Sequence, residues 1–186
     1  MRSIVTPRMV LRPWTLHDLD AWTKLHNGPT IATPGHDHDA RSPTELADDL
    51  ARSVRRWASS DVGPFACEPL LPDEGGDGPA GEPIGSIEFI EAALASEIDP
   101  TQVINWRFSI SGGTDQLVEA ATAALTWIFE HYDLDRIIAP VVVGNRQSVA
   151  VAERLGMVAR YRTVSPERAR WTDVFELTAE RWENRP

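Results

Sequence analysis

A chain of 186 residues, 42% apolar and 25% charged, has the length and composition of one soluble globular domain spanning residues 1–186. Its net charge of −10 argues against a nucleic-acid partner, because nucleic-acid-binding proteins usually present a basic face. No run approaches the ~18 apolar residues of a membrane helix, and the N-terminus lacks the apolar core of a signal peptide. We therefore expect a cytoplasmic protein with no membrane partner.

Two features bear on metal and redox chemistry. Cys67 is the single cysteine, so neither an intrachain disulfide nor a thiolate zinc cluster can form within the chain. It lies in an apolar run, where a buried and inert thiol is expected. The run from His36 to Asp39 alternates histidine with aspartate, but side chains that are consecutive in a loop diverge. We interpret that run as a solvated loop and expect no metal site.

The first third of the chain predicts one strand followed by two helices. Thr15, with Asp18 three residues later, has the pattern of a capping box. Ser42 followed by Pro43 and Glu45 combines an N-cap, a proline at the first helical position and a glutamate at the third. The expected elements are a strand over residues 9–13, a helix over 16–25, a polar loop over 30–41 and a helix from 42 to about 57.

Alternating apolar residues predict the strands of the middle section, over residues 65–70, 84–90 and 104–110. The segment between the first two is rich in glycine, proline and aspartate, which indicates a connecting loop. Residues 92–103 carry no clear pattern. In the second strand Glu88 shares a face with Ile84, Ser86 and Ile90.

The strongest prediction is a long amphipathic helix that follows the turn at Gly112 and Gly113. Its apolar residues recur at i, i+3 and i+4; they are Leu117, Ala120, Ala121, Ala124, Leu125, Ile128, Phe129 and Tyr132. A strand over 136–143, a helix over 147–155 with Gly156 as its C-terminal cap, and strands over 157–164 and 171–177 complete the chain.

This order of elements resembles the GNAT superfamily of acyl-CoA-dependent N-acyltransferases. The segments TPRMVLRPWTLHDLDAW (6–22) and RIIAPVVVGNRQSVAVAERLGM (136–157) resemble its RimJ/RimL-like branch, which acylates amines on protein N-termini or small molecules. The resemblance implies an α/β (α+β) fold: a mixed central sheet of six to seven strands with helices on both faces. It also implies acetyl-CoA as co-substrate, an amine acceptor, and exposed strand edges that often pair into homodimers.

In the GNAT superfamily, a Q/R-x-x-G-x-G/A turn before the long helix holds the CoA pyrophosphate on backbone N–H groups and the positive helix end. Aligned on Glu119-Ala120, this chain has Ile110 in place of the basic or amide residue, Gly113 at the first glycine and Asp115 at the second. The residues implied to bind CoA in this loop are Ser109, Ile110, Gly112, Gly113, Thr114 and Asp115.

Asp115 is the main departure from that pattern. A carboxylate about 4 Å from a phosphate charge costs about 4 kcal/mol at an effective dielectric near 20. Shifting the alignment by one residue, so that Gly112 and Thr114 fill the two glycine positions, avoids this repulsion but needs an extra residue before the helix. Two interpretations stay open: an N-acyltransferase, and a GNAT-fold protein with lost or altered CoA use that acts as a binding module or catalyses another reaction.

Asn145 and Ser148 match the Asn-x-x-Ser of the superfamily. The resemblance implies that Asn145 contacts the pantetheine arm and that Ser148 protonates the departing thiolate. A purely structural alternative is equally open, because Asn145 is also a good helix N-cap. Pro140 would normally argue against a central strand, but GNAT strands that flank the cofactor splay apart, and a missing N–H is tolerable there.

Amine acylation needs a base, and a carboxylate on a central strand can serve. Glu88 is the first candidate, since its apolar face would raise the pKa of the carboxyl group; the alternative is an ion pair with Arg107. The residues that we expect near the acceptor are Trp14, His36, His38 and Glu91. Asp173 matches a family position near the last strand, or pairs with an arginine such as Arg170.

Overall fold

The computed structural model describes residues 3–32, 41–60, 62–70, 81–92, 101–109, 113–164 and 170–185. Within these ranges nine strands form one mixed sheet, whereas the resemblance implied six to seven. The strands are β1 (Ile4–Val5), β2 (Met9–Pro13), β3 (Thr30–Ala32), β4 (Phe65–Pro69), β5 (Gly85–Ala92), β6 (Thr101–Ser109), β7 (Arg136–Val142), β8 (Val158–Val164) and β9 (Trp171–Thr178).

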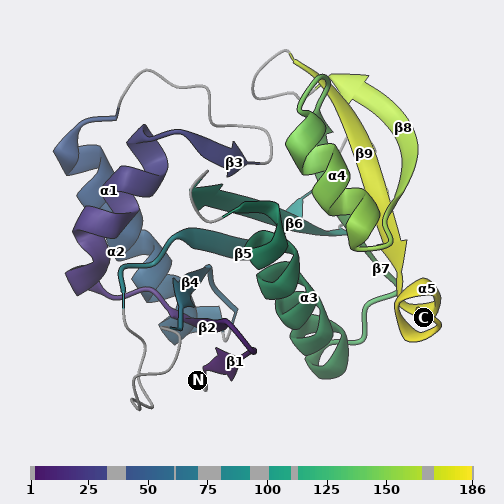
Figure 1. The fold of residues 1–186 in the computed structure, drawn as a ribbon. Coiled ribbons are helices and arrows are strands. Elements are labelled where there is room, and N and C mark those ends of the chain that lie inside the picture. The colour runs from purple at the N-terminus through teal and green to yellow at the C-terminus, as the bar shows by residue number, and fades with distance from the viewer. Residues whose placement is uncertain are drawn as a thin grey trace.

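Helices cover both faces of this sheet, as expected (Figure 1). They are the 3-10 turn η1 (Leu16–Asp18) and the helices α1 (Leu19–Asn27), α2 (Pro43–Ser60), α3 (Gly113–His131), α4 (Arg146–Arg154) and α5 (Ala179–Glu183). No helix of the described residues is long and apolar enough to cross a membrane.

The strand order is β1-β2-β4-β5-β6-β7-β9-β8, with β3 paired to β6 outside this path. Neighbouring strands are antiparallel except β6 and β7, which are parallel. The sheet therefore has two antiparallel halves that meet at this parallel pair. Strands β1 and β8 are its edges, and a homodimer through either edge stays a prediction.

Two apolar clusters fix the helices on the sheet. The larger one packs α3 and α4 on one face through residues that include Leu117, Leu125, Val151 and the strand residues Ile104 and Trp106. The smaller one lies under α1 and α2 on the other face; its buried members are Trp14, Ala21, Trp22, Leu25, Leu46, Leu50 and Ala66. The alternation of apolar residues along the strands thus serves two cores.

The predicted caps are present. Glu45 and Ser42 exchange hydrogen bonds at the start of α2, with the Ser42 N–H 2.9 Å from Glu45 Oε2 and the Glu45 N–H 3.3 Å from Ser42 Oγ. Gly156 follows α4 with φ +81°, a left-handed conformation that favours glycine. Cys67 is fully buried in β4, and burial raises the pKa of its thiol, as expected for an inert core cysteine.

Candidate active site

The parallel pair β6–β7 separates soon after it forms. Its ladder joins Gln102 to Ile137 and Val103 to Ile138, while β6 continues to Ser109 and β7 to Val142. Further along β6, the same edge is taken by β3, which pairs with residues 107–109. Beyond these two pairs, residues 104–109 of β6 and 139–142 of β7 do not pair with each other. We call these two segments the β6–β7 divergence.

Hydrogen bonds to β9 fix the direction in which the β7 backbone points. The Val143 N–H donates to the Trp171 carbonyl at 3.0 Å, and the Asp135 carbonyl accepts from the Ala179 N–H at 2.9 Å. Because main-chain groups alternate along a strand, odd-numbered residues of β7 face β9 and even-numbered ones face β6. The nitrogen of Pro140 therefore faces β6, so the first position after Ile138 on this side of β7 has no N–H donor. Pro140 lies where the ladder ends, in agreement with its predicted place.

The same argument applies to β6. The Ser109 N–H donates to the carbonyl of Ile84, the residue just before β5, at 2.8 Å, so odd-numbered residues face β5. The main-chain groups of Ile104 and Trp106 consequently point to the side of the divergence. The sequence predicted only that their side chains share an apolar face, because the direction of a backbone group leaves no mark on residue identity; strand register supplies that direction.

Glu88 lies beside the divergence. It pairs across the sheet with Asn105, two residues past the last β6 residue that pairs with β7. Its side chain is 35% exposed, and Oε2 is 3.1 Å from Nη1 of Arg56 on α2. Burial raises the pKa of the Glu88 carboxyl group, and the nearby Arg56 charge opposes that rise. A half-buried carboxylate at this place has the surroundings expected of a general base.

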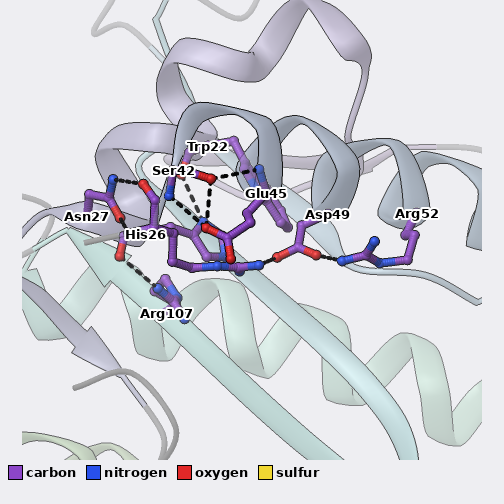
Figure 2. Close-up of polar contacts among 9 residues, drawn as sticks. Trp22, His26, Asn27, Ser42, Glu45, Asp49, Arg52 and Arg107 are labelled. Carbon is purple, nitrogen blue, oxygen red and sulfur yellow. Dashed lines mark hydrogen bonds and ion pairs between the residues drawn. The ribbon is translucent and has the colours of Figure 1, made fainter. Parts of the chain in front are cut away.

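The alternative ion pair of Glu88 with Arg107 is wrong. Arg107 pairs in register with Ser86, not with Glu88. Its buried guanidinium donates to the carbonyls of Leu25 and His26 at the end of α1, both at 3.5 Å (Figure 2). Arg107 therefore ties β6 to α1 instead of neutralising the candidate base.

Polar contacts also hold the facing ends of α1 and α2 together (Figure 2). The Asn27 side chain accepts from the Arg41 N–H and donates to the Arg41 carbonyl, both at 3.0 Å. Asp49 of α2 forms ion pairs with Arg41 and Arg52. His26 Nδ1 lies 2.8 Å from the Trp22 carbonyl, which accepts a hydrogen bond from it. These contacts fix the two helices over the sheet face that carries Glu88.

Asn145 and Ser148 begin α4 next to the divergence. The Ser148 N–H donates to Asn145 Oδ1 at 3.0 Å, so the structural N-cap role of Asn145 is present. The Ser148 hydroxyl is fully buried and accepts a hydrogen bond from the indole N–H of Trp106 on β6, at 3.2 Å. This bond connects α4 to β6 across the divergence. The roles of both residues toward CoA stay predictions.

The expected pyrophosphate loop is described in part. Ile110 and Gly112 lie outside the described residues; Ser109 is the last residue of β6, and Gly113 and Thr114 open α3. Gly113 has φ +72°, a left-handed conformation that favours glycine, and an added Cβ would meet no atom within 4 Å.

Asp115 is not an isolated carboxylate, contrary to the repulsion argument. Its Oδ1 is 2.7 Å from Nη1 of Arg154 in the last turn of α4, with the side chains 70% and 47% exposed. The guanidinium neutralises Asp115 and brings a cation to the N-terminal end of α3. Sequence reasoning missed Arg154 because it is 39 residues away along the chain.

The predicted acceptor residues are not brought together among the described residues. Trp14 is 1% exposed in the core under α1 and α2, where its indole N–H donates to Ser86 Oγ at 3.2 Å, so it does not line an open surface. His36 and His38 lie outside the described residues. Glu91 pairs with Gln102 in the β5–β6 ladder. Asp173 pairs with Arg162 at 2.7 Å instead of Arg170, since β8 and β9 place them opposite each other.

Comparison with known proteins decides the family. The family model described as "Acetyltransferase (GNAT) domain" matches residues 8–158, most of the chain. This protein belongs to the GNAT acetyltransferase family. A GNAT-family acetyltransferase structure from Bordetella pertussis is similar over 95% of this chain and 99% of its own, with 18% identity and a TM-score of 0.74.

Two further solved structures resemble this GNAT protein. Mycobacterium smegmatis RimJ in complex with CoA-disulfide is 20% identical, covering 92% of this chain and 82% of its own, with a TM-score of 0.68. AAC(6')-Ib in complex with ribostamycin and coenzyme A is 18% identical, covering 95% and 96%, with a TM-score of 0.70. At these identities the likeness supports the fold alone.

The GNAT family uses acetyl-CoA, and the described residues fit such a ligand. Backbone N–H groups at a helix start such as that at Gly113 suit phosphate groups. In the described parts of this GNAT protein, no group of three or more His, Cys, Asp or Glu side chains is arranged to hold a metal ion.

Proposed function

We propose that this protein transfers the acetyl group of acetyl-CoA to a primary amine of a small molecule or a protein N-terminus, as a member of the RimJ/RimL-like branch. The observation that carries the proposal is the position of Glu88. Its half-buried carboxylate lies on β5 at the level where β6 and β7 diverge. Glu88 therefore lies one strand away from the β6 segment that we assign to the thioester arm.

Acetyl-CoA supplies a thioester, whose acetyl carbon forms a bond to the amine nitrogen as its bond to sulfur breaks. Glu88 accepts the proton that the amine loses, directly or through one water molecule. Oε2 of Glu88 is engaged by Arg56, and within the described part of the chain Oε1 has no hydrogen bond. Oε1 is therefore the atom that we assign to proton acceptance.

The chain has two groups for the other side of the reaction. The β6 backbone beside the divergence would support the thioester, because preorganised main-chain dipoles stabilise developing charge without reorganisation of solvent. The Ser148 hydroxyl oxygen accepts a hydrogen bond from the Trp106 indole N–H, and a hydroxyl group can also act as a donor. Ser148 would give its proton to the thiolate that leaves. Its full burial requires the sulfur to approach from the divergence.

The Asp115–Arg154 pair bears on the alternative of lost or altered CoA use. Repulsion of phosphate by an uncompensated Asp115 was the physical argument for that alternative. The ion pair supplies the compensating charge, so CoA use is favoured. The net charge of −10 favours cationic acceptors, which amines are at neutral pH.

The test combines binding and turnover. Acetyl-CoA is titrated by calorimetry, and thiol release is then followed with a panel of amines: an N-terminal peptide library, aminoglycosides and amino acids. We expect micromolar binding and acceptor-dependent thiol release, with the acetylated product identified by mass spectrometry. The Glu88→Gln variant should bind acetyl-CoA as the wild type does and lose about 100-fold or more in kcat. No binding by the wild-type protein would support altered CoA use.

A further inference from the structure

Arg56 reaches from α2 to the candidate base and contacts two groups of β5. Its Nη1 lies 3.1 Å from Glu88 Oε2, and its Nη2 donates to the Phe89 carbonyl at 2.9 Å. The two bonds use both arms of one planar guanidinium. Because this fork is rigid, the main-chain carbonyl fixes the plane of the guanidinium, and the guanidinium in turn fixes Oε2.

We propose that Arg56 is the positioning residue for Glu88: anchored on the Phe89 carbonyl, it holds Oε2 and directs Oε1 to the acceptor amine. The inference rests on the proposed function, since it needs Glu88 to be the base. It goes beyond that proposal by assigning a role to a residue that no sequence motif indicated.

The monodentate contact is the main argument for positioning over simple charge pairing. A guanidinium that served only as a counter-ion would gain most from two parallel bonds to both carboxylate oxygens. Arg56 instead gives one arm to the carboxylate and the other to the backbone. One carboxylate oxygen is thereby fixed while the other keeps its lone pairs.

The surroundings of Glu88 leave Arg56 as its direct charged partner. Charged and titratable side chains of neighbouring elements are engaged elsewhere: Arg12 with Asp18 and Glu68, Arg107 and His26 with α1 carbonyls, and Asp49 with Arg41 and Arg52. Arg56 also lowers the pKa of Glu88 against the effect of burial. Its removal should therefore shift the ionisation of Glu88 to higher pH.

The experiment compares Arg56→Met and Arg56→Lys with Arg55→Met, a charge loss at the adjacent and exposed position of α2. Glu88 is titrated directly by carbon NMR of protein labelled at the glutamate carboxyl groups, with Glu88→Gln identifying its signal. Steady-state kinetics are measured over the same pH range with acetyl-CoA and the best acceptor of the panel.

Arg56→Met should raise the Glu88 titration midpoint by about one pH unit or more and move the acidic limb of kcat/KM by the same amount. Above that limb kcat should stay about 10-fold or more below wild type, because the carboxylate is no longer oriented. Arg56→Lys should restore the midpoint, since the charge returns, but recover kcat only in part. Arg55→Met should match the wild type in both readouts.

The two proposals fail differently. Wild-type kcat in Glu88→Gln would overturn Glu88 as base, and the positioning role with it. A large kcat loss in Glu88→Gln combined with an unchanged Glu88 midpoint in Arg56→Met would overturn Arg56 alone. Loss of thermal stability in Arg56→Met with unaltered midpoint and pH limb would mark Arg56 as a structural residue and also overturn the inference.

Discussion

The indole N–H of Trp106 donates to the buried hydroxyl of Ser148 at 3.2 Å, and this bond joins the two strand–helix units that border the divergence. Trp106 belongs to β6, and Ser148 lies in the first turn of the helix that follows β7. The bond therefore has a structural effect whatever the chemistry of the hydroxyl group.

Replacement of Ser148 separates its structural effect on stability from its proposed role as a proton donor. Ser148→Ala leaves a buried indole N–H without this acceptor, and we expect a loss of about 1–3 kcal/mol in the free energy of unfolding, measured by urea denaturation. If the hydroxyl also protonates the thiolate, kcat of the variant should fall below that of the wild type, most strongly with acceptors for which thiolate departure limits the rate. Ser148→Ala with full kcat and reduced stability would leave Ser148 with the structural role only.

Arg154 should matter for CoA affinity through Asp115. Arg154→Met leaves the Asp115 carboxylate uncompensated at the start of α3, so acetyl-CoA binding should weaken about fivefold or more, given the partial exposure of the pair. The double variant Asp115→Asn/Arg154→Met removes the repulsion and should recover most of the affinity by calorimetry. Arg181→Met, an equal charge loss on α5, is the control. Equal affinities in all four proteins would show that the pair is remote from the bound phosphates.

Pro140 gives a direct test of the divergence. Pro140→Ala restores a backbone N–H that faces β6, beyond the last ladder pair. Since β6 has moved away at this level, we expect the new amide to exchange with solvent much faster than that of Ile138, and stability to change by no more than about 1 kcal/mol. Hydrogen exchange measured by NMR reads both amides in one sample. Strong protection at residue 140 would mean that the strands can close.

His26 should make stability depend on pH. Burial, together with the nearby Arg107 charge, lowers the pKa of His26 to about 3. The unfolded chain, with an ordinary histidine pKa near 6.5, then binds a proton between about pH 6.5 and 3 that the folded chain does not. Stability should fall as pH drops through this window, by up to about 1.4 kcal/mol per pH unit.

The His26→Asn variant retains a donor for the Trp22 carbonyl but does not titrate. Its stability should consequently fall less steeply than that of the wild type between pH 6.5 and 4 in urea denaturation. The imidazole signals of His26 should not titrate between pH 5 and 8. A midpoint near 6.5 would contradict the buried environment of this ring.

Glu119 connects the N-terminal strands to α3. Its carboxylate accepts from the Arg8 N–H at 2.9 Å and from Arg8 Nε at 2.6 Å, and it also accepts from the Thr6 hydroxyl. Although burial opposes it, the net effect of these bonds lowers the Glu119 pKa. The stability that they contribute is complete above the unfolded pKa and is lost as pH falls through the folded value.

We therefore expect Glu119→Gln to lose about 1–2 kcal/mol near neutral pH, because Arg8 is half exposed. The difference from the wild type should shrink below about pH 4, where the wild-type carboxyl group becomes protonated. Thermal unfolding of both proteins from pH 3 to 7 measures this difference in stability. A difference that does not vary with pH would show that the charge of Glu119 contributes nothing.

Local signals in the sequence were sufficient for most elements. Ser42, Pro43 and Glu45 define the start of α2, and Gly156 defines the end of α4, because caps depend on residues within one turn. Short elements escaped prediction: β1, β3 and α5 span two to five residues, too few to establish a period. Residues 101–103 were left unassigned, yet they extend β6 and carry its pairing with β7.

The contacts of the candidate site were harder to predict from the sequence, and Glu88 illustrates the reason. Alternation places Glu88 and Arg107 on one face of the sheet, but only register decides which residues are opposite each other. The true register puts Asn105 across from Glu88, and the partner that binds its carboxylate comes from α2, 32 residues away along the chain. Such long-range pairs leave no local pattern, as is also true of Asp115 and Arg154.

The single parallel joint in an otherwise antiparallel sheet has a thermodynamic consequence. Among the described residues, the half of the sheet that ends at β6 is connected to the half that begins at β7 by two ladder pairs, one indole–hydroxyl bond, the packing of α3 and α4, and the apolar cluster of Val103, Ile138 and Val174. A ligand that contacts both halves would add contacts across the joint, and ligands that bind only the folded state raise its stability. We expect the substrate-free enzyme to begin unfolding along this seam, and saturating acetyl-CoA to delay that first step more than any later one.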